Sequence, residues 1–304
     1  MHVLLPVAGI SISLPLLVGV GALVGFLSGL FGVGGGFLLT PILMMVGIPP
    51  TVAAASDSCQ IVAASSSGSA AHFRLGNVDM KLGSALLLGG LVGGWIGVYV
   101  IKFLRAMGSA DFVITVTYVV VLSGIGGFMF WESLRNLRRG ALEPQAHIVM
   151  GGGGILGKLP FQMEFRRSRV RHSIMLPFVL GMMVGTLAAV MGVGGGFIMV
   201  PMMVYLLRMP MHVAVGTDLF QILFTCAGVT FMQAFTNHTV DILLALLLAA
   251  GSTIGAQIGA RLGRHLRGDQ LKILLASIVL LVMVKMAAGL VQTPSVLLSA
   301  AKGH

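Results

Sequence analysis

The sequence predicts an all-α, polytopic membrane protein of two five-segment repeats, and three observations lead to this fold class. The mean hydropathy is +1.01. Only 9% of the residues are charged, too few to cover the surface of a soluble domain of this length. A glycine-rich string occurs twice, as GVGGGFLLTP at 32–41 and GVGGGFIMVP at 192–201. Duplicated hydrophobic segments broken by glycine are typical of membrane transporters, and the breaks mark the substrate site.

Ten apolar segments can be delimited, five in each repeat. They lie at 12–31, 34–47, 51–73, 80–104 and 111–133, and then at 173–191, 194–208, 211–236, 240–263 and 270–291. The second segment of each repeat is short, because about 15 residues rise only about 22 Å, less than the hydrocarbon core of a bilayer. It is expected to form either a short span or one half of a re-entrant hairpin.

The basic residues set the expected topology. The net charge is +10, but no Lys or Arg precedes Arg74, and the densest cluster lies between Arg135 and Arg171. This distribution predicts a cytoplasmic linker rather than a nucleic-acid surface. The predicted units are a first repeat at 1–134, a basic linker at 135–172 and a second repeat at 173–304. An odd number of crossings per repeat then places the N-terminus outside and gives the repeats opposite orientations.

The two repeats correspond beyond the glycine string. Asp79 and Asp241 each start the fourth segment of their repeat. The string GGWIG at 93–97 matches GAQIG at 255–259, with small residues at both ends of each. The offset between the repeats drifts only from 160 to 162 residues, which supports an internal duplication.

The glycine strings are the predicted substrate-binding elements. Consecutive glycines weaken a helix, and the freed backbone groups inside a bilayer must find protein, water or ligand. A helix that restarts after the break directs its positive N-terminal end at the gap, which favours an anion. The alternative is close helix packing or a tight turn between helices. The predicted binding glycines are Gly32, Gly34, Gly35, Gly36, Gly192, Gly194, Gly195 and Gly196.

A second pair of polar positions follows each string. Asp57 and Gln60 lie three residues apart and share one helix face, as do Asp218 and Gln221. A carboxyl group within a membrane segment is costly and indicates function, here as a coupling group with the glutamine as a polar neighbour. The alternative is that each Asp, or the hydroxyl residue before it, caps a helix N-terminus.

The sequence contains no catalytic constellation and no nucleotide-binding motif, so neither an enzyme nor an ATP-driven pump is expected. No cofactor is expected. No His or Cys residues have metal-ligand spacing, so no metal site is predicted. Cys59 and Cys226 fall within apolar segments and are interpreted as packing residues.

At these residues the chain resembles the sulfite exporter TauE/SafE family, also called the toluene sulfonate uptake permease family. The matching features are GLFGVGGGFLLTP at 29–41, AVMGVGGGFIMVP at 189–201, AVGTD at 214–218 and the small-residue strings at 93–97 and 255–259. The resemblance implies a transporter with duplicated halves that moves sulfur-containing anions across the bacterial inner membrane. The family usually has Thr-Ser where this chain has Ser56-Asp57 and Thr217-Asp218.

We therefore expect a secondary transporter of small anions such as sulfite, organosulfonates or related oxyanions. A protonated Asp57 or Asp218 accompanying the anion would be compatible with proton coupling, because ionised carboxylates would repel the substrate. The competing interpretations are a passive anion channel and a membrane assembly protein whose glycines only pack helices. The expected partners are the anionic substrate and the lipid bilayer, with a homo-oligomer left open and no nucleic acid.

Overall fold

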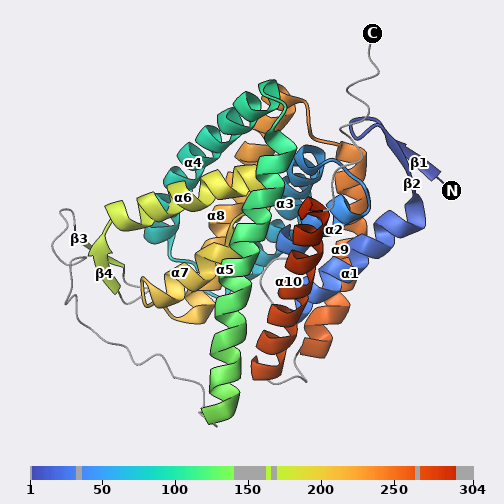
Figure 1. The fold of residues 1–304 in the computed structure, drawn as a ribbon. Coiled ribbons are helices and arrows are strands. Elements are labelled where there is room, and N and C mark those ends of the chain that lie inside the picture. The colour runs from blue at the N-terminus through green and yellow to red at the C-terminus, as the bar shows by residue number, and fades with distance from the viewer. Residues whose placement is uncertain (1, 32–35, 140–161, 166–169, 264–267, 292–304) are drawn as a thin grey trace.

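Helices dominate the computed structural model, which describes residues 2–31, 36–139, 162–165, 170–263 and 268–291 (Figure 1). The helices before the predicted linker are α1 (Leu14–Phe31), α2 (Gly36–Met45), α3 (Pro50–Arg74), α4 (Met80–Ala106) and α5 (Ala110–Arg139). Those after it are α6 (Met175–Met191), α7 (Gly196–Tyr205), α8 (Met211–Met232), α9 (Ile242–Gly263) and α10 (Gly268–Val291), with a π-helix η2 (Gln233–Asn237) directly after α8. Each predicted apolar segment overlaps one of these helices over most of its length, so the predicted all-α fold class is confirmed.

Two short antiparallel hairpins were not predicted. Strands β1 (His2–Leu5) and β2 (Ile10–Ser13) precede α1, and strands β3 (Gln162–Phe165) and β4 (Val170–Ser173) precede α6. Their registers correspond, since His2 pairs with Ser13 and Gln162 pairs with Ser173. The second hairpin lies within the predicted linker at 135–172 except for its last residue, Ser173, and most of that linker lies outside the described residues. The boundaries of the two repeats and of the linker stay a prediction.

Helix length and composition separate the elements that can cross a bilayer alone from those that cannot. Among the described residues, four stretches are long and apolar enough to span: Met80–Ala106, Ala110–Phe128, Met211–Asn237 and Ile242–Gly259. Helices α2 and α7 have ten residues each and rise only about 15 Å, half the hydrocarbon thickness. Helix α3 is long enough but rich in serine, and it buries most of its polar side chains against its neighbours.

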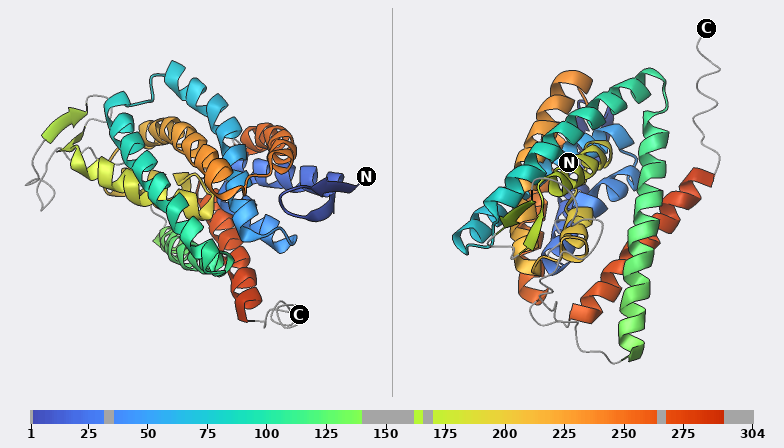
Figure 2. Two further views of the ribbon diagram at one scale, coloured as in Figure 1. Left: turned by 90° about the horizontal axis from the view of Figure 1, so that it is seen from above. Right: turned by 90° about the vertical axis from the view of Figure 1, so that its left-hand side faces the viewer.

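The halves on either side of the linker are held together by helices that pair across them. Helix α1 packs along α9, and α6 packs along α4, as the views in Figures 1 and 2 show. Glycines make these contacts close: a methyl group on Gly93 of α4 would lie 1.9 Å from the Met182 carbonyl oxygen of α6. At the corresponding contact, a methyl group on Gly255 of α9 would lie 2.0 Å from the Ala22 carbonyl oxygen of α1. Small residues at this spacing allow helix backbones to approach closely in a membrane.

Helices α3 and α8, which occupy equivalent places in the two halves, pack antiparallel to each other. Gly68, late in α3, lies beside Leu219, early in α8. Ile61, earlier in α3, clusters with Cys226, later in α8. Helices α5 and α10 also run in opposite directions where they cross (Figure 2). Oppositely directed equivalent helices are what inverted repeats would produce, although the orientation in the membrane stays a prediction.

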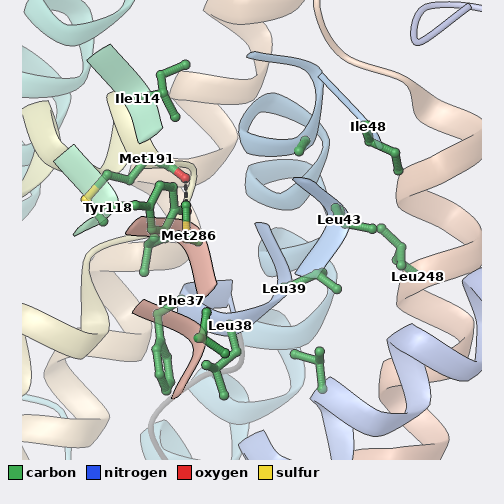
Figure 3. Close-up of a cluster of buried hydrophobic side chains, with 14 of the residues drawn as sticks. Phe37, Leu38, Leu39, Leu43, Ile48, Ile114, Tyr118, Met191, Leu248 and Met286 are labelled. Atoms are coloured by element: carbon green, nitrogen blue, oxygen red, sulfur yellow. Dashed lines mark hydrogen bonds between the residues drawn. The ribbon is translucent and has the colours of Figure 1, made fainter. Parts of the chain in front are cut away.

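The short helices α2 and α7 meet in the middle of the protein. The rings of Phe37 and Phe197, each one residue after the last glycine of its string, stack with centroids 4.4 Å apart and planes 5° apart. Phe37 belongs to a buried apolar cluster that surrounds α2 and includes Leu38, Leu39 and Leu43 (Figure 3). The apolar core thus positions the starts of α2 and α7 next to one another.

Candidate functional site

The second glycine string forms a sharp junction between two helices. Helix α6 ends at Met191, and Gly192 caps it in the left-handed conformation with φ of 75°. Gly194 and Gly195 have φ values of 70° and 88°, a backbone conformation that favours glycine. Helix α7 then begins at Gly196. The prediction that the helix restarts at the end of the string is confirmed.

Only the end of the first string can be compared with this junction. Gly32, Gly34 and Gly35 lie outside the described residues, and Gly36 begins α2. A methyl group on Gly36 would lie 3.2 Å from the Val193 carbonyl oxygen, so the end of the first string contacts the second.

Close packing explains why some positions of the second string are glycine. A methyl group on Gly192 would lie 2.1 Å from the Ala54 carbonyl oxygen of α3. Gly194 lies against Cys226 and Ile61, and Gly195 lies against Val184. Packing therefore accounts for Gly192, and the binding role of these glycines stays a prediction.

Asp57 and Asp218 lie about two turns inside α3 and α8, so neither caps the helix that carries it. The hydroxyl residues before them instead support other helices. Ser56 Oγ accepts a 3.0 Å hydrogen bond from the Asp241 backbone N–H at the start of α9. Thr217 Oγ1 accepts a 3.1 Å bond from the Asp79 N–H at the start of α4. The same contact thus occurs twice, at equivalent positions of the two halves.

Asp57 is fully buried and has a hydroxyl partner from the broken segment. Thr40 Oγ1 of α2 donates a 2.7 Å hydrogen bond to Asp57 Oδ2. Asp57 Oδ1 has no hydrogen-bond partner. Thr40 precedes the proline of the first string, and Val200 occupies the equivalent place in the second.

Asp218 is buried against the start of α7. It is 3% exposed, and its Oδ1 has no hydrogen-bond partner. A methyl group built on Gly196, the first residue of α7, would lie 2.7 Å from Asp218 Oδ2 and 2.8 Å from Ile222 Cδ1. The first N–H groups of an α-helix have no partner within the helix, so this end carries partial positive charge. The Asp218 carboxyl group therefore lies beside the helix start that was predicted to bind an anion.

The two glutamines find hydroxyl partners on different helices. Gln60 Nε2 donates a 2.6 Å hydrogen bond to Ser252 Oγ of α9. Gln221 Nε2 donates a 2.9 Å bond to Thr225 Oγ1 of its own helix, and Gln221 Oε1 has no partner. Gly90, equivalent to Ser252, leaves room for this pair, since a methyl group there would lie 2.8 Å from Gln221 Nε2.

These polar groups converge on one region between α3 and α8. The Cys226 thiol lies within electrostatic range of both Asp57 and Asp218. Cys226 also clusters with Ile61 and Ile222, so the region has an apolar wall. The structure brings together Asp57, Asp218 and the start of α7, with a glutamine one turn beyond each carboxylate.

Sequence reasoning missed three polar residues around this region. Thr40 and Ser252 bind Asp57 and Gln60 as described above. The buried Tyr118 of α5 donates a hydrogen bond to the Met191 carbonyl oxygen at the end of α6 (Figure 3). The only sequence signal for Thr40 was its place in the duplicated string, where the second copy has valine. For Tyr118 and Ser252 no signal distinguished them from other hydroxyl residues in apolar segments.

An apolar groove of about 960 Å³ lies elsewhere, between α4 and α8. Trp95, Tyr99 and Phe231 line it, and none of the predicted site residues does. A lining of this kind suits lipid acyl chains rather than a small anion, because it offers almost no polar group.

Comparison with known proteins gives one family. The family model described as sulfite exporter TauE/SafE matches residues 17–286. The probable membrane transporter proteins YunE and YjnA of Bacillus subtilis are each 28% identical to the chain, over 79% and 86% of its length and 85% and 94% of theirs. Sulfite exporter TauE/SafE family protein 1 of Arabidopsis thaliana is 33% identical over 36% of this chain and 26% of its own. No solved structure matches the chain.

Proposed function

Because the chain belongs to the sulfite exporter TauE/SafE family and is therefore a multi-pass membrane transporter rather than an enzyme, we propose that it carries small sulfur-containing anions. The substrate class is sulfite, an organosulfonate or a related oxyanion. Transport is secondary and proton-coupled, and one half rocks against the other around a fixed site. The bilayer is the bacterial inner membrane, with the N-terminus in the periplasm and the linker in the cytoplasm.

One observation carries this proposal: buried polar oxygens without partners lie beside a broken helix. Asp218 Oδ1 and Gln221 Oε1 are buried on α8 without hydrogen bonds, and Asp218 lies against the first residue of α7. Unpartnered polar atoms are rare in protein interiors and are explained by a ligand, water or proton that completes them. A helix N-terminus supplies backbone N–H groups for an anion, and the apolar wall at Ile222 suits the carbon of a small sulfonate.

The coupling role is proposed for Asp57 and Asp218, with Gln60 and Gln221 as polar neighbours. A carboxyl group in a membrane interior is stabilised by protonation when no counter-charge is present. Two carboxyl groups beside the place of an anion therefore provide sites at which a proton can offset its charge.

Flux into proteoliposomes tests the proposal. Labelled sulfite and a labelled small sulfonate are supplied with and without an imposed pH gradient. We expect uptake that the gradient stimulates, and loss of that stimulation in at least one of the variants Asp57→Asn and Asp218→Asn. Asp111→Asn serves as the matched control, because Asp111 is an exposed carboxylate that accepts a hydrogen bond from the Thr51 N–H.

Two other outcomes contradict the proposal in different ways. Flux that ignores the pH gradient would identify a channel or uniporter with the same substrate. Absence of flux for either anion, from protein that is folded by gel filtration, would remove the substrate assignment and favour a membrane assembly protein.

A further inference from the structure

The two carboxyl groups of the site differ in what holds them. Asp57 Oδ2 accepts a 2.7 Å hydrogen bond from Thr40, whereas the second string has Val200, which cannot donate one, at the equivalent position. Asp218 instead lies with Oδ2 against Gly196 at the N-terminal end of α7, and its Oδ1 has no partner. One carboxyl group is anchored by a side chain, and the other faces only a helix end.

A carboxylate and a sulfonate or sulfite present the same chemistry to a helix N-terminus, because both are anions with oxygens that accept N–H hydrogen bonds. The place beside Gly196 is narrow, since even a methyl group there would lie 2.7 Å from Asp218 Oδ2. A substrate anion can therefore reach this place only when the Asp218 side chain leaves it, and the partial positive charge of the helix end holds the ionised side chain more strongly than the protonated one. Two negative charges in a buried region would also repel each other strongly.

From this geometry we propose that Asp218 competes with the substrate for the N-terminal end of α7. The ionised carboxylate of Asp218 occupies this end, and protonation of Asp218 releases the side chain so that the anion can bind there. The inference rests on the proposed function and assigns the coupling proton to Asp218 alone. Asp57 then acts as a positioning residue that holds α2 to α3 through Thr40. Proton and anion bind together, so they move in the same direction.

The ionisable groups around Asp218 come from few elements. Helix α3 contributes Asp57, and also His72, whose Cβ lies beside Gly216. Helix α4 contributes Asp79 at its start, beside Thr217, and the exposed Lys81. Helix α8 itself contributes Cys226 and, at its first turn, His212. The described side chains of α6, α7 and η2 include no ionisable group.

The test uses the purified full chain and methanesulfonate, whose charge does not change over the pH range of the assay. Its affinity is measured at a series of pH values by thermal stabilisation or calorimetry. A protonated Asp218 is required for binding, so affinity should fall as pH rises, by about tenfold per pH unit where Asp218 is ionised. Asp218→Asn cannot ionise and should bind with little pH dependence. Asp57→Asn should keep the pH dependence of the unaltered protein.

Proton uptake provides a second readout that needs no variant. By reciprocity, an anion that binds only the protonated form must draw a proton from solution. We expect about one proton taken up per methanesulfonate bound in weakly buffered solution above the titration range of Asp218. Binding without proton uptake would overturn the inference even if Asp218→Asn failed to fold.

The outcomes separate this inference from the proposed function. An unchanged pH dependence in Asp218→Asn, or its loss in Asp57→Asn alone, would overturn the competitor role while leaving an anion transporter. Failure of the folded protein to bind either methanesulfonate or sulfite at any pH would remove the proposed function and the inference with it.

Discussion

The two halves have the same arrangement of helices but differ in the side chains that form hydrogen bonds with their buried polar groups. Ser56 and Thr217 support the starts of α9 and α4 in the same way. Near the carboxyl groups the halves diverge, because Thr40 holds Asp57 while Val200 leaves Asp218 without that partner. The duplicated framework is thus conserved between the halves where it supports helices, and it differs where a mobile proton or anion would be handled.

Stability should depend most on the close contacts of α1 with α9 and of α4 with α6, which we call the two helix seams. Gly93→Ala and Gly255→Ala each place a methyl group about 2 Å from a backbone carbonyl of the facing helix, which cannot move without shifting the helix. We expect each to lower the free energy of unfolding by about 3 kcal/mol, the upper end of the usual cost of overpacking. Thermal unfolding in detergent measures the effect.

Two glycines provide matched controls for this prediction. Gly19 of α1 and Gly124 of α5 have nothing within 4 Å of an added methyl group. Their alanine variants should keep or slightly raise stability, since alanine favours helix. If only one seam variant were destabilised, the two seams would not be equivalent.

Exchanging the hydroxyl between the halves should produce the next largest effect. Thr40→Val removes the donor to a buried carboxyl oxygen and should destabilise the protein by about 1–3 kcal/mol. Val200→Thr offers Asp218 a new donor and should stabilise the protein by about 0.5–1.5 kcal/mol while slowing transport. Unfolding midpoints and flux are measured on both variants.

Thr40→Ser keeps the hydroxyl and is the control for the first substitution. Destabilisation by Val200→Thr would show that Asp218 does not accept a hydrogen bond from this position, and would contradict the comparison between the two halves.

Substitution of the two glutamines should give the smallest difference in stability between the halves. Gln60→Met removes a 2.6 Å hydrogen bond to Ser252, which still donates to the Ala249 carbonyl. Gln221→Met removes a 2.9 Å hydrogen bond to Thr225 Oγ1 but also an amide oxygen that has no partner, so the loss and the gain partly cancel. Gln60→Met should therefore be less stable than Gln221→Met by about 1 kcal/mol, whereas Gln221→Met should weaken anion flux more. A larger loss of stability in Gln221→Met would contradict this.

The sequence predicted the helices well because apolar segments and duplicated glycines are strong signals. Asp79 and Asp241 were correctly placed at helix starts, and α7 begins within the predicted string. The partners of the polar groups could not be predicted. Ser58 and Ser65 bond only to carbonyls of their own helix, while Ser252 binds a glutamine on another, and nothing in the local sequence separates these cases. The hairpins were missed because strands of four residues have no resolvable periodicity.

The pairing of α1 with α9 and of α4 with α6 has a consequence for how the protein is made. The ribosome delivers α1 and α4 to the membrane long before their partners are synthesised, so their glycine faces meet only lipid at first. Assembly cannot finish until α9 has been inserted. A chain truncated after the linker would leave the glycine faces of α1 and α4 without their partner helices. Such a chain would be degraded by membrane quality control and would not act as a half-size carrier.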